Sequence, residues 1–138
     1  MAPTFFTADE ANRLLPALES VMRGLQTKRQ LLRERQQTLE AFRVRASRNG
    51  GVVPGTDVAE AQREGARLLA EIQEGVQQIE SWGGVVKDLD RGLVDFLACR
   101  GQEQVYLCWR LGETEIRFWH GLHEGFAGRK PLREDPLG

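Results

Sequence analysis

The residues best suited to chemistry lie near the end of the chain, between Trp119 and Arg129. This segment contains both histidines, His120 and His123, together with Glu124. Histidine and carboxylate side chains are common metal ligands and general acids or bases. The HExxH spacing that places two histidine ligands on one helix face is absent, however, and the glycines of the segment favour a loop. We therefore expect no metal centre and no cofactor.

His120 itself allows three interpretations. The favoured one is a half-buried histidine whose ring donates a hydrogen bond to a backbone carbonyl, and metal ligation or acid–base and ligand contact stay open as alternatives. Arg129 follows two glycines, so its guanidinium could hold an anion or tie the tail to a carboxylate.

The segment from Trp119 to Arg129 would be positioned by β-strands that the sequence predicts just before it. Gly112-Glu113 is a two-residue loop with glycine first, the signal of a type II′ hairpin. This loop predicts the pairs Trp109–Ile116, Leu107–Phe118 and Val105–His120. An earlier run, residues 93–98, can pair with residues 105–110 as Val94–Trp109, Phe96–Leu107 and Ala98–Val105. Both registers give one continuous apolar face, which a slip of one residue would destroy.

The opposite face of this sheet is polar and is the candidate ligand site. It carries Leu93, Asp95, Leu97, Tyr106, Cys108, Arg110, Glu115, Arg117 and Trp119. One interpretation is a solvated face with cross-strand ion pairs, including Arg110 opposite Glu115. The other is a site for an anion or a catalytic site, formed with the adjoining loop by Asp95, Arg110, Arg117, Trp119, His120, Glu124 and Arg129. In this register Asp95 and His120 point to opposite faces, so they could not bind one ion together unless the sheet curled strongly.

The two cysteines add no further site. Cys108 faces Asp95 across the predicted hairpin, whereas Cys99 lies beyond the strand end. We expect no disulfide, and the pair lacks the CxxC spacing of a zinc site.

Residues 7–82 predict a long helical hairpin with a connecting loop at 47–56. Thr7 and Glu10 form a capping box, Pro16 predicts a kink, and Gly83-Gly84 predicts the end of the second helix. Leucines at intervals of seven form a coiled-coil-like stripe in the first helix: Leu18, Leu25, Leu32 and Leu39. Gly65 and Gly75 in the second helix suggest a close approach of the two helices.

Charge separates the two helices and limits the function classes. Residues 28–48 contain seven basic and two acidic side chains, whereas residues 57–82 contain two basic and six acidic ones. An antiparallel hairpin would bring these charges together, which explains the basic run without nucleic acid. The net charge of −1 gives no reason to expect an anionic membrane. No transmembrane segment or signal peptide is recognisable, and we expect a cytoplasmic protein.

Three stretches resemble a known bacterial family. They are FTADEANRLLP near the start, GVVKDLDRGLVDF in the centre and VYLCWRLGETEIRFWHGLHEGFAGRKPL at the end. Together they are similar to the uncharacterised domain-of-unknown-function family 2203. The resemblance implies a bacterial cytosolic protein, and it implies no catalytic residue because no activity is attached to the family.

The sequence thus predicts a single α+β domain spanning 1–138. A long antiparallel helical hairpin precedes a small antiparallel sheet of three or four strands, with a fourth strand at residues 85–88. The hairpin is much longer than the sheet, which favours a non-enzymatic interaction or assembly module that forms a homodimer through its helices. The alternative is a small-ligand or catalytic domain that uses the polar sheet face and the His120–Arg129 loop.

Overall fold

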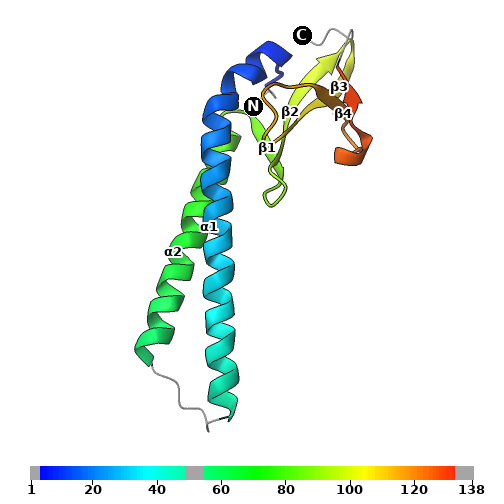
Figure 1. Cartoon of the computed structure of the whole chain (residues 1–138). Helices are drawn as coiled ribbons and strands as arrows, with labels where there is room; N and C mark the ends of the chain where they lie inside the picture. The colour runs from blue at the N-terminus through cyan, green and yellow to red at the C-terminus, as the bar shows by residue number, and fades with distance from the viewer. Residues whose placement is uncertain (1–3, 49–54, 133–138) are drawn as a thin grey trace.

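The computed structural model describes residues 4–48 and 55–132. Two antiparallel helices, α1 (Ala8–Arg48) and α2 (Gly55–Ser81), stand beside a five-stranded antiparallel sheet (Figure 1). The strands follow chain order: β1 (Gly84–Asp88), β2 (Leu93–Arg100), β3 (Glu103–Arg110), β4 (Phe118–Gly121) and β5 (Lys130–Pro131). A short 3-10 helix, η1 (Phe126–Gly128), precedes β5. The predicted α+β architecture is confirmed, and the sheet has five strands rather than three or four.

Local signals in the sequence set the ends of the helices. The backbone N–H of Thr7 donates to Glu10 and that of Glu10 donates to the Thr7 hydroxyl, which is the predicted capping box. Gly83 takes a positive φ of 99° directly after α2. Pro16 lies inside α1, and the dark blue first turns of that helix run at an angle to the rest (Figure 1). Of the predicted loop at 47–56, residues 49–54 lie outside the described residues, and the others belong to the two helices.

The leucine stripe of α1 is used inside the chain. Leu18, Leu25 and Leu32 are buried against α2 and the sheet, whereas Leu39 is half-buried. A side chain at Gly75 of α2 would place its Cβ 2.4 Å from Cδ2 of Leu25, so glycine permits the close approach there. Because Leu32 is covered by its own chain, it is not the surface that a second copy could contact.

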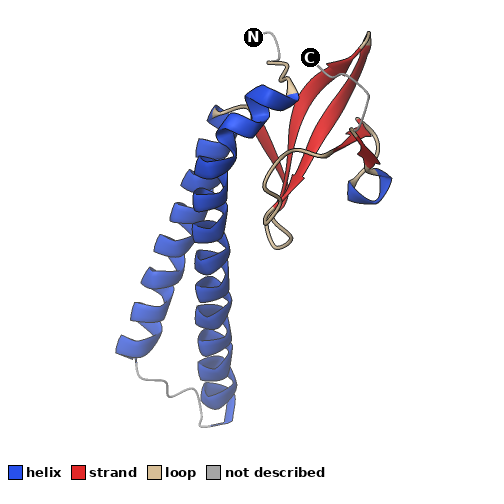
Figure 2. Cartoon of the chain, turned by 45° about the horizontal axis from the view of Figure 1, so that its top comes forward, coloured by secondary structure: helices blue, strands red, loops and turns tan. Residues whose placement is uncertain are grey.

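The apolar face of the sheet packs on the base of the hairpin. The β2–β3 register is the predicted one, with Val94 opposite Trp109, Phe96 opposite Leu107 and Ala98 opposite Val105. These six side chains are buried with helix residues in one core. The predicted strand at 85–88 is β1, which pairs with β2. Figure 2 shows the helices on one side of the sheet, with η1 beyond β4 on the other side.

The predicted β3–β4 register is wrong by one residue. Phe118 pairs with Cys108, Trp119 with Leu107 and His120 with Tyr106. The connection between β3 and β4 is seven residues long rather than two, because residues in it form hydrogen bonds outside the β-sheet. The Ile116 N–H donates to the Asn12 side chain (2.6 Å), and the Trp109 indole donates to the Glu113 carbonyl (2.9 Å). As a result Trp119 faces the core, and His120 faces away from the helices.

The basic run of α1 meets two kinds of acidic partner. Arg33 pairs with Asp90 in the β1–β2 turn at 2.6 Å, and Arg29 lies 3.7 Å from the same carboxylate. Arg35 pairs with Glu64 of α2 at 3.2 Å. The predicted neutralisation by α2 therefore accounts for part of the run, and the sheet accounts for another part. Within the described residues, neither helix has a stretch that is long and apolar enough to cross a bilayer.

Candidate functional site

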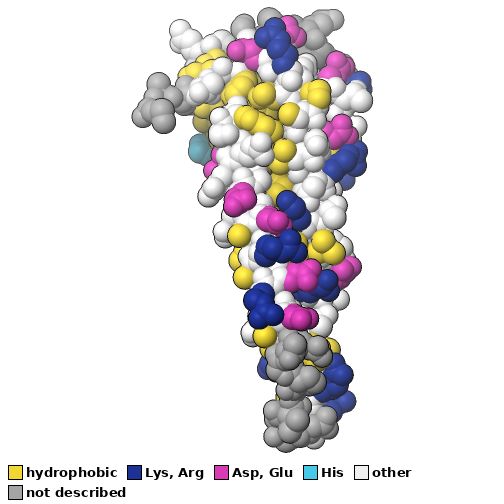
Figure 3. Space-filling model, turned by 90° about the vertical axis from the view of Figure 1, so that its left-hand side faces the viewer, with side chains coloured by type: hydrophobic (Ala, Val, Ile, Leu, Met, Phe, Trp, Pro, Cys, Tyr) yellow, Lys and Arg dark blue, Asp and Glu magenta, His cyan; other side chains and the backbone are white. Residues whose placement is uncertain are grey.

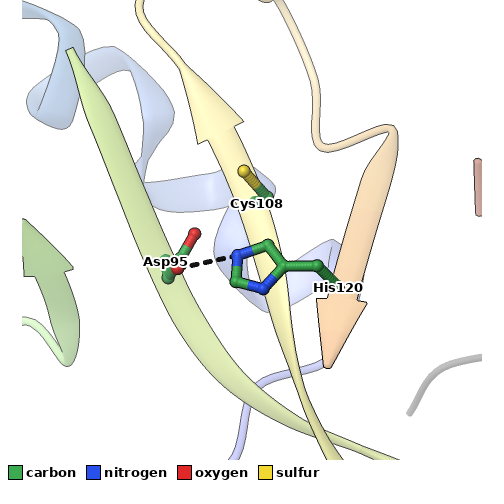
Figure 4. Close-up of side chains that lie close together, drawn as sticks. All are labelled: Asp95, Cys108 and His120. Carbon is green, nitrogen blue, oxygen red and sulfur yellow. Dashed lines mark hydrogen bonds and ion pairs between the residues drawn. The ribbon is translucent and has the colours of Figure 1, made fainter. Parts of the chain in front are cut away.

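Three buried polar side chains meet on the sheet face that points away from the helices. Asp95 of β2 and Cys108 of β3 are directly opposite each other, and His120 of β4 is opposite Tyr106, two residues from Cys108. Alternation along the strands therefore places all three on one face. Nε2 of His120 lies 2.8 Å from Oδ2 of Asp95, and Figure 4 shows the Cys108 sulfur beside this pair. Asp95, Cys108 and His120 are termed the buried triad below.

The hydrogen bonds of His120 fix the protons of the pair. Nδ1 lies 2.8 Å from the Gly121 carbonyl oxygen, which can only accept, so Nδ1 carries a hydrogen. The contact between Nε2 and Asp95 then needs one further proton between the two groups. Either a charged imidazolium donates to the Asp95 carboxylate, or a neutral Asp95 donates to the imidazole. Both forms leave the pair with no net charge.

Burial controls the ionisation of the other two members. Asp95 is 2% exposed, and burial raises the pKa of its carboxyl group above the usual range, although His120 and the Cys108 thiol oppose this shift. Burial and the neighbouring Asp95 charge raise the pKa of the Cys108 thiol to about 12. Near neutral pH, Cys108 is therefore a thiol that hydrogen-bonds to Asp95.

This arrangement is unsuited to nucleophilic catalysis. A cysteine nucleophile needs a thiolate and a base that touches it, but both ring nitrogens of His120 already have other partners. Cys108 is also only 1% exposed, so a substrate could not reach its sulfur. The triad does have the composition of a metal site. One ligand atom from each residue lies within 4.8 Å of the others, the one such group of three among the described residues.

The segment after β4 packs beside the triad and is held by Arg129. Its guanidinium pairs with Glu113 at 2.7 Å, stacks 4.0 Å from the centre of the Phe118 ring, and donates to the Cys108 carbonyl at 3.3 Å. Phe126 of η1 covers it from another side, 4.6 Å from the ring centre. Two roles were predicted for Arg129, anion binding and pairing with a carboxylate, and the structure shows the pairing with a carboxylate.

Glu124 closes the loop that follows His120. It accepts hydrogen bonds from the Lys130 ammonium at 2.7 Å and from the Gly121 N–H at 2.8 Å. These bonds hold the pKa of Glu124 below its usual range. Glu124 is exposed and forms no part of the buried triad.

The remaining predicted ligand residues lie in surroundings that differ from those of the buried triad. Trp119 is a correction, because it lies on the core face at 6% exposure. Arg110 keeps the predicted polar face of β3, but its predicted pair with Glu115 is wrong, because its backbone N–H bonds to Glu113 and no strand of the described residues lies opposite it on that side. Arg117 pairs with its near neighbour Glu115 at 3.1 Å in an exposed loop. The ligand roles of Arg110 and Arg117 stay predictions.

Sequence reasoning missed the triad although it placed two of its members correctly. The predicted β2–β3 register already put Cys108 opposite Asp95, and that pairing is confirmed. The separation of Asp95 from His120 was wrong, because it followed from the shifted β3–β4 register. The favoured interpretation of His120, donation to a backbone carbonyl, is confirmed, but the ring is fully buried rather than half-buried.

The comparisons with known proteins place the chain in a family without assigning an activity. Searches of curated proteins and of solved structures find no match to this chain. The model of the family described as uncharacterized conserved protein (DUF2203) matches residues 4–132, and the chain therefore belongs to that family.

Proposed function

We propose that this chain is a non-enzymatic interaction module that self-associates through the α1–α2 hairpin. The observation that supports this most is the length of the hairpin relative to the sheet. At 1.5 Å per residue, the 41 residues of α1 span about 60 Å and the 27 residues of α2 span about 40 Å. Both helices continue well below the β1–β2 turn (Figure 1), where Asp90 contacts Arg33. The lower half of the hairpin is thus a two-helix arm.

Two helices cover each other incompletely in this arm. Leu39 and Phe42 of α1 are half-buried there, and Val44 is 39% exposed. Figure 3 shows hydrophobic side chains interspersed with charges down the arm, and a denser hydrophobic stripe nearer the sheet. Apolar side chains on a helix pair gain most from burial when further helices pack against it.

One side of the hairpin offers a groove for another helix. A hollow of about 300 Å³ opens between the helices at Gly24 and Lys28, and a second of about 310 Å³ opens at Arg35 and Phe42. Lys28, Arg35 and Phe42 follow at intervals of seven residues, so both hollows open on the same side of α1. A Cβ added at Gly24 would meet nothing within 4 Å, which leaves room for a neighbouring side chain.

Charge favours a second copy of this chain as the occupant. Lys28 lies on the α1 side of the groove and Glu74 on its α2 side, whereas Arg35 and Glu64 already pair within the chain at 3.2 Å. In a two-fold dimer the basic α1 of one copy can lie against the acidic α2 of its partner, and the reverse contact forms by symmetry. The cytosolic location and bacterial origin expected from the sequence belong to this proposal.

The test is sedimentation equilibrium of the wild type and two Gly24 variants. Wild-type protein should be dimeric at micromolar concentration, and Gly24→Arg should weaken association at least tenfold, about 1.4 kcal/mol, by filling the groove. Gly24→Ala is the matched control, because it gains the same helix propensity without the bulk. A wild-type monomer at all concentrations, or equal association of the two variants, would contradict the proposal.

A further inference from the structure

We propose that the buried triad of Asp95, Cys108 and His120 binds a divalent transition metal, and that Zn²⁺ suits it best. The three residues come from adjacent strands in the middle of the sheet, so their backbones are held rigidly. Each of them offers a different donor, namely oxygen, sulfur and nitrogen. Zinc in proteins is bound by these three donor types.

The spacing of the donors requires only small side-chain movements. Zinc bonds of about 2.0–2.3 Å in tetrahedral geometry place ligand atoms about 3.3–3.8 Å apart. The three donor atoms of the triad already lie within 4.8 Å of one another. Oδ2 of Asp95 and Nε2 of His120, now 2.8 Å apart, would separate slightly to admit the ion.

The orientation of His120 is the one that a metal ligand needs. Its Nδ1 donates to the Gly121 carbonyl, which fixes the ring and turns Nε2 towards Asp95 and Cys108. Metal-binding histidines almost always make such a hydrogen bond through the nitrogen that does not touch the metal. This bond can persist unchanged when the ion is bound.

Charge also favours a divalent ion at this position. All three residues are at most 2% exposed, so an uncompensated charge there would be costly. A Cys108 thiolate and an Asp95 carboxylate would balance a divalent cation, and His120 would contribute a neutral nitrogen. The occupied site would therefore have no net charge, like the metal-free triad.

The donor set discriminates among metals. Magnesium and calcium prefer oxygen ligands, whereas a set containing thiolate and imidazole favours zinc and its neighbours in the first transition row. The described residues supply three ligands, which leaves one position of a tetrahedral site for water or another small donor. The expectation of a metal-free protein rested on the spacing of His120, His123 and Glu124 and on a register that put Asp95 and His120 on opposite faces. The observed register puts Asp95 and His120 on the same face.

The chain provides matched controls because it has two cysteines and two histidines, one of each in the triad. Wild-type protein and the variants Cys108→Ser, His120→Gln, Cys99→Ser and His123→Gln would be refolded with Zn²⁺, dialysed and analysed for metal. Titration with Co²⁺ would report Cys108 directly, since a thiolate–cobalt bond gives a charge-transfer band in the near ultraviolet. Cys108→Ser keeps a hydroxyl that can donate to Asp95, and circular dichroism would verify that each variant is folded.

We expect one zinc per chain in the wild type and in the Cys99 and His123 variants. Mutation of a residue that only hydrogen-bonds to a metal ligand typically weakens metal binding about 10- to 100-fold, and loss of a ligand itself should weaken zinc binding by more than this. Cys108→Ser should also abolish the cobalt charge-transfer band. Substoichiometric zinc in refolded wild-type protein would overturn the proposal. Stoichiometric zinc that survives in folded Cys108→Ser and His120→Gln would overturn it equally.

Discussion

The contact between Asp95 and His120 predicts a large and non-additive effect on stability. In metal-free protein with chelator present, His120→Ala leaves a 2% exposed carboxyl group whose remaining side-chain partner is the Cys108 thiol. Removing one partner of a buried ion pair typically lowers the free energy of unfolding by about 3–5 kcal/mol. Because Asp95 keeps its hydrogen bond to the thiol, we expect a loss of about 3 kcal/mol. The matched control His123→Ala removes an exposed ring and should change stability by about 0.5 kcal/mol or less.

A double-mutant cycle separates the interaction from the loss of each side chain. Asp95→Ala should also destabilise, because it leaves Nε2 of His120 buried without its partner. The double variant contains neither group, so no unpaired partner remains. Its loss of stability should therefore be smaller than the sum of the two single losses by about 2 kcal/mol. Urea unfolding monitored by tryptophan fluorescence measures all four proteins. Single losses that add to within about 0.5 kcal/mol would refute the coupling.

The same variant predicts the sign of a pH dependence. In the wild type the His120 charge opposes the rise in the Asp95 pKa that burial causes. Without His120 the folded-state pKa of Asp95 lies still further above its unfolded value. Stability from such a group is fully present below the unfolded pKa and is lost as pH rises through the folded pKa. The His120→Ala variant should therefore be more stable at about pH 5 than at about pH 7.5, and a variant whose stability rises over that interval would refute this reasoning.

Two further predictions use paired positions in the chain. Gly75→Ala should lower stability by about 1–3 kcal/mol in urea unfolding, because the new Cβ would lie 2.4 Å from Leu25, whereas Gly24→Ala has open space and should raise stability by up to about 1 kcal/mol. The same sign for both would contradict the packing argument. Cys99, which is only partly buried, should react with a thiol reagent in native protein, whereas Cys108, with its pKa of about 12, should react only after unfolding. Equal rates for the two thiols would contradict its burial.

The helices and the first hairpin could be predicted because several independent signals agreed. Thr7 and Glu10 form the cap that their spacing indicates, and Gly83 ends the second helix with the positive φ that glycine allows. In β2 and β3 the six core side chains recur at every second position, so one register places them all on one face: Val94, Phe96, Ala98, Val105, Leu107 and Trp109.

The register of β4 could not be obtained in this way because its alternation is ambiguous. Phe118 and Trp119 are adjacent aromatic residues, so either parity of the strand places one of them in the core. The choice is made by tertiary contacts, above all the bond from the Ile116 N–H to Asn12 of α1, 104 residues away in the chain. A local turn signal at Gly112-Glu113 carries no information about that bond. The observed register differs from the predicted one by one residue, and this difference places His120 on the same face as Asp95, where the two form the triad with Cys108.

The two proposals concern different parts of the molecule and can fail independently. The groove lies along the helices at Gly24, whereas the triad lies on the sheet face that points away from them. Gly24→Arg should therefore bind zinc like the wild type, and Cys108→Ser should associate like the wild type in sedimentation equilibrium. If zinc instead shifted the dimer equilibrium, linkage would require the dimer to bind zinc with a different affinity from the monomer. That result would refute independence and would imply that the sheet, as well as the arm, responds to the partner copy.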